Sequence, residues 1–102
     1  MTSADVQKLV GKWFHTYEEP EQPGEGRVMK WQGKVISSPA KGYFLVQLFS
    51  WLMGEPTTQK IVRFDDMRNW DFYSSFEEKE AAWRRYEERR AQRLEQSTME
   101  VV

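Results

Sequence analysis

The sequence of 102 residues contains no cysteine and a single histidine, His15. Without thiols the chain can form no disulfide, no thiolate metal site and no cysteine nucleophile, which is consistent with a cytosolic protein, because disulfides are rare in that compartment. No apolar run approaches the length of about 20 residues that spans a bilayer, and residues 1–10 lack the basic start and apolar block of a signal peptide. We therefore expect a cytoplasmic protein with no membrane contact.

A strong net charge is also lacking, since 15 Lys and Arg stand against 16 Asp and Glu. A near-neutral chain has no strong positive potential to attract a polyanion, which argues against a protein dedicated to coating nucleic acid. The sequence has no glycine-rich phosphate motif, no Gly-x-Ser-x-Gly and no spacing typical of metal ligands. These absences favour a protein without catalysis, metal or cofactor.

The remaining candidates for chemistry have simpler interpretations. Residues 18–26 hold four carboxylates, two prolines and two glycines, a composition that predicts a mobile acidic loop and a poor metal cage. Asp65 and Asp66 are adjacent in an expected turn, where their side chains diverge, so a cap plus a surface charge is favoured over a catalytic pair. His15 has no fixed partner in the sequence, which favours packing at a strand end.

What the sequence has in abundance is aromatic residues: five Trp, four Tyr and six Phe. A domain of this size cannot bury so many large rings completely. Some Trp or Tyr side chains should therefore lie half exposed, where a partner can reach them.

Residues 43–53 form the longest apolar run, bounded by Gly42 and Gly54. Side chains alternate between the two faces of a strand, and here neither face is polar. One face would carry Phe44, Val46, Leu48 and Leu52, and the other Tyr43, Leu45, Phe49, Trp51 and Met53. This pattern predicts the central strand of a sheet, covered on both sides.

The residues around this run predict a single domain, 1–102, that is mainly β. Turn residues separate further short strands, and Gly33 is expected to mark a bend or bulge. A single helical turn at 65–69 should be capped by Asp65, with Met67 plugging the end of the core. The expected strands are 9–17, 27–37, 59–64 and 70–73, in addition to the central one.

A charged C-terminal helix is expected over 75–96, followed by a loose tail at 97–102. Ser74 with Glu77 and Ser75 with Glu78 are spaced as two capping boxes. Arginines crowd the later turns, which suits the negative end of the helix dipole. An apolar stripe should be formed by Phe76, Ala82, Trp83 and Tyr86.

The order of these elements resembles the small SH3-like barrels of the Tudor and KOW type. The resemblance covers residues 9–73 and implies a five-stranded antiparallel barrel over that range. It is carried by short motifs, namely Phe44, Val46 and Leu48, followed by Val62, Phe64, Asp66 and Met67. The chain also resembles small accessory proteins of phages, plasmids and integrons.

A second resemblance is to the plasmid type II dihydrofolate reductases, SH3-like barrels that bind NADPH and dihydrofolate in the pore of a tetramer. It is carried by residues 27–33, Gly42-Tyr43 and Ile61, and it would make Lys30 and Ile61 pore residues. The sequence departs from that family at Lys60 and Val62, where the family has glutamine and tyrosine.

We expect the chain to be a protein-interaction module, binding a protein partner or a second copy of itself. The outer face of the central strand needs a cover, which either the C-terminal helix or such a partner can supply. The expected binding residues are Trp31, Tyr43, Trp51 and Trp70, flanked by Arg84, Arg85 and Arg89. Nucleic acid is the alternative partner, through the basic residues Lys30, Lys34, Lys41, Lys60, Arg63 and Arg68 around Trp31.

Overall fold

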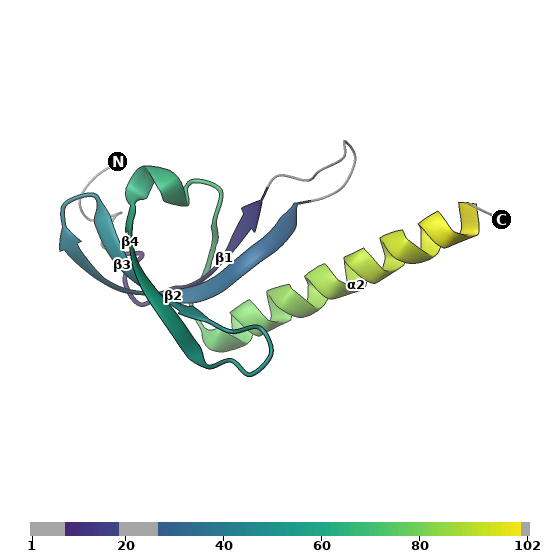
Figure 1. The fold of residues 1–102 in the computed structure, drawn as a ribbon, viewed down its shortest axis with the longest axis horizontal. Coiled ribbons are helices and arrows are strands. Elements are labelled where there is room, and N and C mark those ends of the chain that lie inside the picture. Colours follow the sequence, from purple (N-terminus) through teal and green to yellow (C-terminus); the bar gives the residue numbers. More distant parts are fainter. Residues whose placement is uncertain (1–7, 19–26, 101–102) are drawn as a thin grey trace.

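The chain forms a five-stranded antiparallel sheet followed by a long helix (Figure 1). This computed structural model describes residues 8–18 and 27–100. The strands lie in the order β4-β3-β2-β1-β5. The elements are, along the chain, β1 (Trp13–Glu18), β2 (Val28–Ala40), β3 (Tyr43–Phe49), β4 (Pro56–Arg63), the 3-10 helix η1 (Phe64–Met67), β5 (Asp71–Tyr73) and α2 (Phe76–Glu100).

The mainly β class, the five antiparallel strands and the C-terminal helix are confirmed, but the sheet is not closed into the expected barrel. Among the described residues, β4 and β5 form the two ends of the strand order and do not pair with each other. The chain passes between them as the helical turn η1, which supplies no ladder of backbone hydrogen bonds. The Met67 side chain of this turn is buried in the core, as the sequence predicts.

The core lies on one face of the sheet, and β3 supplies it by simple alternation. Phe44, Val46 and Leu48 are buried, as expected for one face of this strand. Phe14 of β1 is fully buried, and its ring stacks on Trp70 with 4.7 Å between the ring centroids. The buried cluster consists of Phe14, Val35, Phe44, Val46, Leu48 and Met67.

Gly33 lies in the middle of β2, opposite Phe14 of β1. A Cβ atom at this position would collide with the Phe14 ring and with the carbonyl oxygen of Gln47. Gly33 itself is paired with both neighbouring strands, and the register of β2 shifts on either side of it: against β1 between His15 and Tyr17, and against β3 between Val35 and Ser37 and between Ser37 and Ala40. Gly33 is required for the close approach of its neighbours.

Two predictions for residues 43–53 were wrong. The centre of the sheet is β2, and β3 lies second from the end of the strand order. The strand also stops at Phe49, and Leu52, predicted to be buried, is 91% exposed in a turn. The chain reverses here because Ser50 supplies a hydroxyl acceptor and Gly54 adopts φ +68, both favourable in tight turns.

The start of α2 agrees with the predicted capping residues. The Glu78 N–H donates to Ser75 Oγ at 3.1 Å, and the Glu78 carboxylate accepts the Ser74 N–H at 3.0 Å. Glu78 therefore bonds to both serines, in place of two separate boxes. The helix runs to Glu100, beyond the expected end at residue 96, and its second half projects away from the sheet (Figure 1).

Asp65 does not cap η1, which corrects another expectation. The residue before this turn, Arg63, forms no side-chain cap, and the Asp65 carboxylate pairs with Arg68 at 3.1 Å. The acidic loop predicted at 18–26 falls mostly on residues 19–26, which lie outside the described residues, as do 101–102 of the predicted tail.

Candidate functional site

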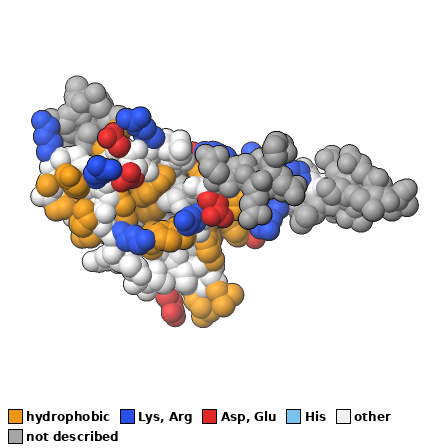
Figure 2. Space-filling model, turned by 45° about the horizontal axis from the view of Figure 1, so that its top comes forward, with side chains coloured by type: hydrophobic (Ala, Val, Ile, Leu, Met, Phe, Trp, Pro, Cys, Tyr) orange, Lys and Arg blue, Asp and Glu red, His pale blue; other side chains and the backbone are white. Residues whose placement is uncertain are grey.

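The turn between β3 and β4 presents two apolar side chains to solvent beside the start of α2. Leu52 is 91% exposed and Met53 is 70% exposed. The N–H groups of Met53 and Glu55 both donate to Ser50 Oγ at 3.3 Å, and the Ser50 N–H donates to the Glu55 carbonyl at 2.9 Å. Both side chains are therefore displayed from an ordered backbone. Figure 2 shows hydrophobic side chains reaching the surface, including at the tip of a protruding part of the molecule.

Aromatic rings from the sheet and the helix form a groove beside this turn. The Trp51 ring stacks on Trp83 of α2, with 4.6 Å between centroids. Trp13 of β1 lies 5.5 Å from Phe49 and 5.3 Å from Phe76 by the same measure. Helix α2 thus covers one side of Trp51, which stays 39% exposed. We call this cavity of about 370 Å³ the turn–helix groove; it is lined by Trp13, Gln32, Phe49, Trp51, Leu52, Met53, Gly54, Phe76, Lys79, Glu80 and Trp83.

A second cavity, which we call the Lys–Trp cleft, adjoins the groove and shares Phe49 and Trp51 with it. The ammonium of Lys60 lies 3.9 Å from the centroid of the Trp31 ring, and that of Lys30 lies 5.2 Å away. Trp51 Nε1 donates to the Lys30 carbonyl at 3.1 Å, which ties the two cavities together. The combined surface is apolar at the turn and basic at the cleft.

A buried lysine forms the polar floor of the groove. Lys79 of α2 is 2% exposed, and its ammonium donates to Gln32 at 2.6 Å and to Glu80 at 2.8 Å. Sequence reasoning missed this burial, because a lysine between glutamates is typical of a solvated helix face. The available signal was position: Lys79 lies three residues after Phe76 and four before Trp83, on the stripe that faces the sheet.

His15 is fully buried next to this lysine. Its Nδ1 lies 2.9 Å from the Tyr73 hydroxyl, and among the described residues Nε2 has no hydrogen-bond partner. Burial lowers the pKa of His15 from its ordinary 6.5 to about 4, and the Lys79 ammonium acts in the same direction. The carboxylates of Asp71 and Glu80 oppose the shift without cancelling it. His15 is therefore a neutral packing residue at neutral pH.

This burial predicts a loss of stability in mild acid. Between pH 6.5 and about 4 the unfolded chain protonates His15 while the folded chain does not, so the free energy of unfolding should fall as the pH falls through this range, by about 3 kcal/mol in total. Urea unfolding of wild type and His15→Gln at several pH values measures the effect. The free energy of unfolding should fall more steeply with acid in wild type than in His15→Gln, because only wild type carries the buried imidazole, whereas the carboxylates titrate in both proteins. Two proteins whose free energies of unfolding change in parallel with pH would contradict the prediction.

The residues expected to bind lie in several places. Trp31 and Trp51 come together in the Lys–Trp cleft. Tyr43 is 43% exposed at the start of β3, and it lines neither the groove nor the cleft. Trp70 packs on Phe14 against the core. All three arginines are exposed on α2, and Arg85 and Arg89 also line a separate cavity.

Leu52, Met53 and Phe76 were absent from the expected set, because the sequence assigned the first two to a strand and the third to an apolar helix stripe. Ser50 and Gly54 were the signals for the turn. Within the described residues no group of three or more His, Asp or Glu is placed to hold a metal ion, and no helix is long and apolar enough to cross a membrane.

Comparisons with known proteins yielded no family, since no protein-family description, no curated protein and no solved structure matches the chain. The positions that would correspond to reductase pore residues are Lys30 on β2, beside Trp31, and Ile61 on β4, where its side chain is exposed.

Proposed function

We propose that the chain is a protein-interaction module without catalytic activity. Its binding surface is the turn–helix groove together with the Lys–Trp cleft, and its partner is a protein segment that carries apolar anchors next to carboxylates. The observation that carries the proposal is the display of Leu52 and Met53 on a hydrogen-bonded turn beside an aromatic groove.

Burial of the apolar part of the surface by a partner would stabilise the complex. Covering a Leu or Met side chain that is otherwise exposed contributes about 1.5 to 3 kcal/mol. In the described part of the chain nothing covers Leu52 or Met53, and Trp51 and Phe76 are also partly exposed. Aromatic residues and methionine are enriched where proteins bind one another, particularly at the centre of an interface.

The surface is ordered before any partner arrives. The Trp51 ring is fixed by its stack on Trp83 and by its hydrogen bond to the Lys30 carbonyl. Ser50 fixes the turn backbone. Because less conformational entropy is lost when preformed groups bind, such a surface can hold a short segment.

The two lysines of the Lys–Trp cleft indicate that the partner carries a negative charge. Lys30 and Lys60 both lie over the Trp31 ring, and neither forms an ion pair with a carboxylate in the part of the chain that the structure describes. A carboxylate on a bound segment would meet both ammonium groups beside an apolar ring, where a charge pair is less screened than in open water.

Selection of a random peptide library on the protein tests the proposal. Peptides with two or more large apolar residues near Asp or Glu should be enriched, and a synthetic copy should bind wild type measurably by calorimetry. Leu52→Asp should weaken its binding at least about tenfold, because a charge replaces an anchor. Ile61→Asp, an equal change at an exposed apolar residue of β4, is the matched control and should bind like wild type.

The charge assignment has its own check. Lys60→Gln should weaken the acidic peptide but not a copy in which Gln replaces its Asp and Glu residues. The proposal fails if no peptide is enriched, if the enriched peptides lack carboxylates, or if Leu52→Asp and Ile61→Asp bind alike.

Separate measurements test two other occupants of the surface, a second copy of the chain and a nucleic acid. Light scattering after size exclusion should show a monomer, and a dimer that Leu52→Asp dissociates but Ile61→Asp does not would replace the foreign partner by a second copy of the chain. Titration into labelled single-stranded DNA at two salt concentrations should show no binding. Steeply salt-dependent binding that is lost in Lys60→Gln would favour nucleic acid instead.

A further inference from the structure

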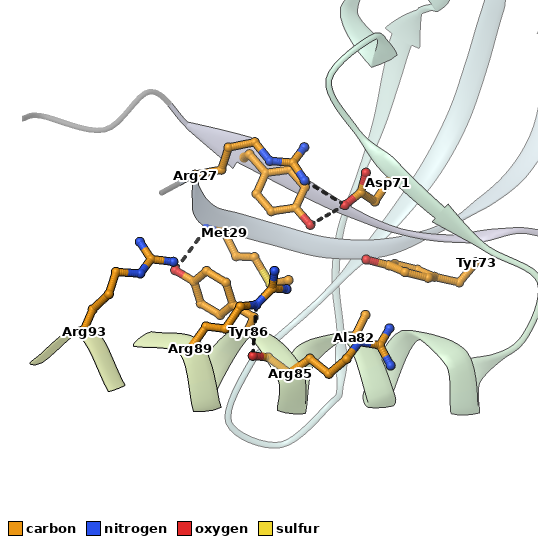
Figure 3. A pocket seen from close by; sticks show the side chains of 10 residues that line it. Arg27, Met29, Asp71, Tyr73, Ala82, Arg85, Tyr86, Arg89 and Arg93 are labelled. Carbon is orange, nitrogen blue, oxygen red and sulfur yellow. Dashed lines mark hydrogen bonds and ion pairs between the residues drawn. The ribbon is translucent and has the colours of Figure 1, made fainter. Parts of the chain in front are cut away.

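A third cavity, of about 260 Å³, lies between α2 and the part of the sheet formed by β1, β2 and β5. It shares no lining residue with the turn–helix groove or the Lys–Trp cleft. Figure 3 shows Arg27 and Asp71 on the sheet side of this cavity, with Arg85, Arg89 and Arg93 on the helix side. Four arginines and one carboxylate thus line the same cavity.

That carboxylate is already engaged. Asp71 accepts the Tyr17 hydroxyl at 2.7 Å and a guanidinium N–H of Arg27 at 3.2 Å. Arg27 also lies over the Tyr17 ring, 4.0 Å from its centroid. The charge of Asp71 therefore balances that of Arg27, and no other carboxylate of the described residues lines the cavity to balance the charges of the three helix arginines.

The helix arginines have no carboxylate partner among the described residues. Within the part of the chain that the structure describes, Arg89 Nε donates to the backbone carbonyl of Arg85, at 3.4 Å. Arg85, Arg89 and Arg93 follow one another at intervals of four, so they share one face of the helix, where like charges destabilise each other. An anion bound between them would remove this repulsion.

Phenol groups complete the lining. Burial raises the pKa of Tyr17 and of Tyr73, so both hydroxyls keep their protons throughout the neutral range. The Tyr86 hydroxyl accepts the Met29 N–H at 3.3 Å and keeps its own proton available as a donor. The Tyr17 hydroxyl already donates to Asp71, and the Tyr73 hydroxyl lies 2.9 Å from His15 Nδ1, so the donors that the cavity offers a ligand are the guanidinium groups and the Tyr86 hydroxyl.

We propose that this cavity binds a phosphate group, either as the free ion or as the monoester of a small molecule. Guanidinium groups match phosphate oxygens with paired hydrogen bonds, which a single ammonium cannot do. The cavity is slightly smaller than the usual range for sites of drug-sized ligands, so it suits a small anion and not a polymer. The site is independent of the proposed protein-binding surface.

Calorimetric titration with inorganic phosphate, phenyl phosphate and adenosine monophosphate tests the assignment. The double variant Arg85→Gln/Arg89→Gln should weaken binding at least about tenfold, because each lost charged hydrogen bond is a substantial part of the affinity. The matched control Arg84→Gln/Arg90→Gln removes the same charge from residues of α2 that do not line the cavity, and should bind within about twofold of wild type. Circular dichroism checks that both variants fold.

Equal affinity for the three ligands would assign the site to the phosphate group alone, and tighter binding of one ester would assign it to that class of ester. The proposal is overturned if none of the three binds at millimolar concentration, or if the control loses as much affinity as the cavity variant. Leu52→Asp should leave phosphate binding unchanged, so the two proposals can fail separately.

Discussion

Gly33→Ala is expected to lower the free energy of unfolding by about 3 kcal/mol or more, at the upper end for overpacked cores. The new methyl group would meet the Phe14 ring on one side and the Gln47 carbonyl oxygen on the other. Phe14 is fully buried, and the carbonyl belongs to the neighbouring strand, so neither can withdraw without moving the sheet. Urea unfolding followed by tryptophan fluorescence measures the loss.

Gly11→Ala is the control that separates collision from backbone strain. Gly11 has φ +89, a conformation unfavourable for alanine, but no atom lies within 4 Å of the added Cβ. Its replacement should cost only about 1 to 2 kcal/mol. If the two variants lose equal stability, the close approach at Gly33 does not limit the packing of the sheet.

Phe44→Ala is expected to cost about 3 to 5 kcal/mol, the range for removing a large ring from a core. Phe44 is fully buried on β3, with the Phe64 ring 6.4 Å away between centroids. Equilibrium unfolding in urea should show a lower midpoint with an unchanged slope, because the variant loses packing without altering the surface exposed on unfolding.

The adjacent residue provides the comparison. Tyr43 points to the opposite face of β3 and is 43% exposed, so Tyr43→Ala should cost less than about 1.5 kcal/mol. A larger loss for Tyr43→Ala than for Phe44→Ala would mean that the inner and outer faces of this strand have been exchanged.

The sequence was informative wherever a local pattern decides the structure. Alternation identified Phe44, Val46 and Leu48 as one buried face, and the two serines before the helix located its start. Met67 was correctly expected at the end of the core. Each of these features depends on neighbours within a few residues along the chain.

Long-range relations were harder to predict. The apolar run of 43–53 suggested a central strand, but hydrophobicity does not distinguish a middle strand from one beside it, because both pack on the same core. Closure of the sheet depends on whether β4 meets β5, and no residue pattern within either strand settles that. The expected barrel failed for this reason.

The candidate surfaces were predicted only in part. The surplus of rings correctly implied exposed aromatic residues, and Trp31 and Trp51 do line one cleft. Leu52, the most exposed apolar side chain of the proposed surface, was predicted to be buried because it continues the alternating apolar pattern of β3 beyond the turn at Ser50. The sequence does not associate Arg27 with the helix arginines, because it lies far along the chain from the residues with which it lines a cavity.

The open sheet has a consequence for the behaviour of the chain in concentrated solution. In the part of the chain described, β4 has one side without a strand partner, and nearly all its residues are exposed. Such an edge can recruit strands of other molecules and lead to aggregation, which Pro56, Lys60 and Arg63 oppose by removing a donor and adding charge. With a formal net charge of −1 the molecules scarcely repel one another, so solubility depends on these few edge residues.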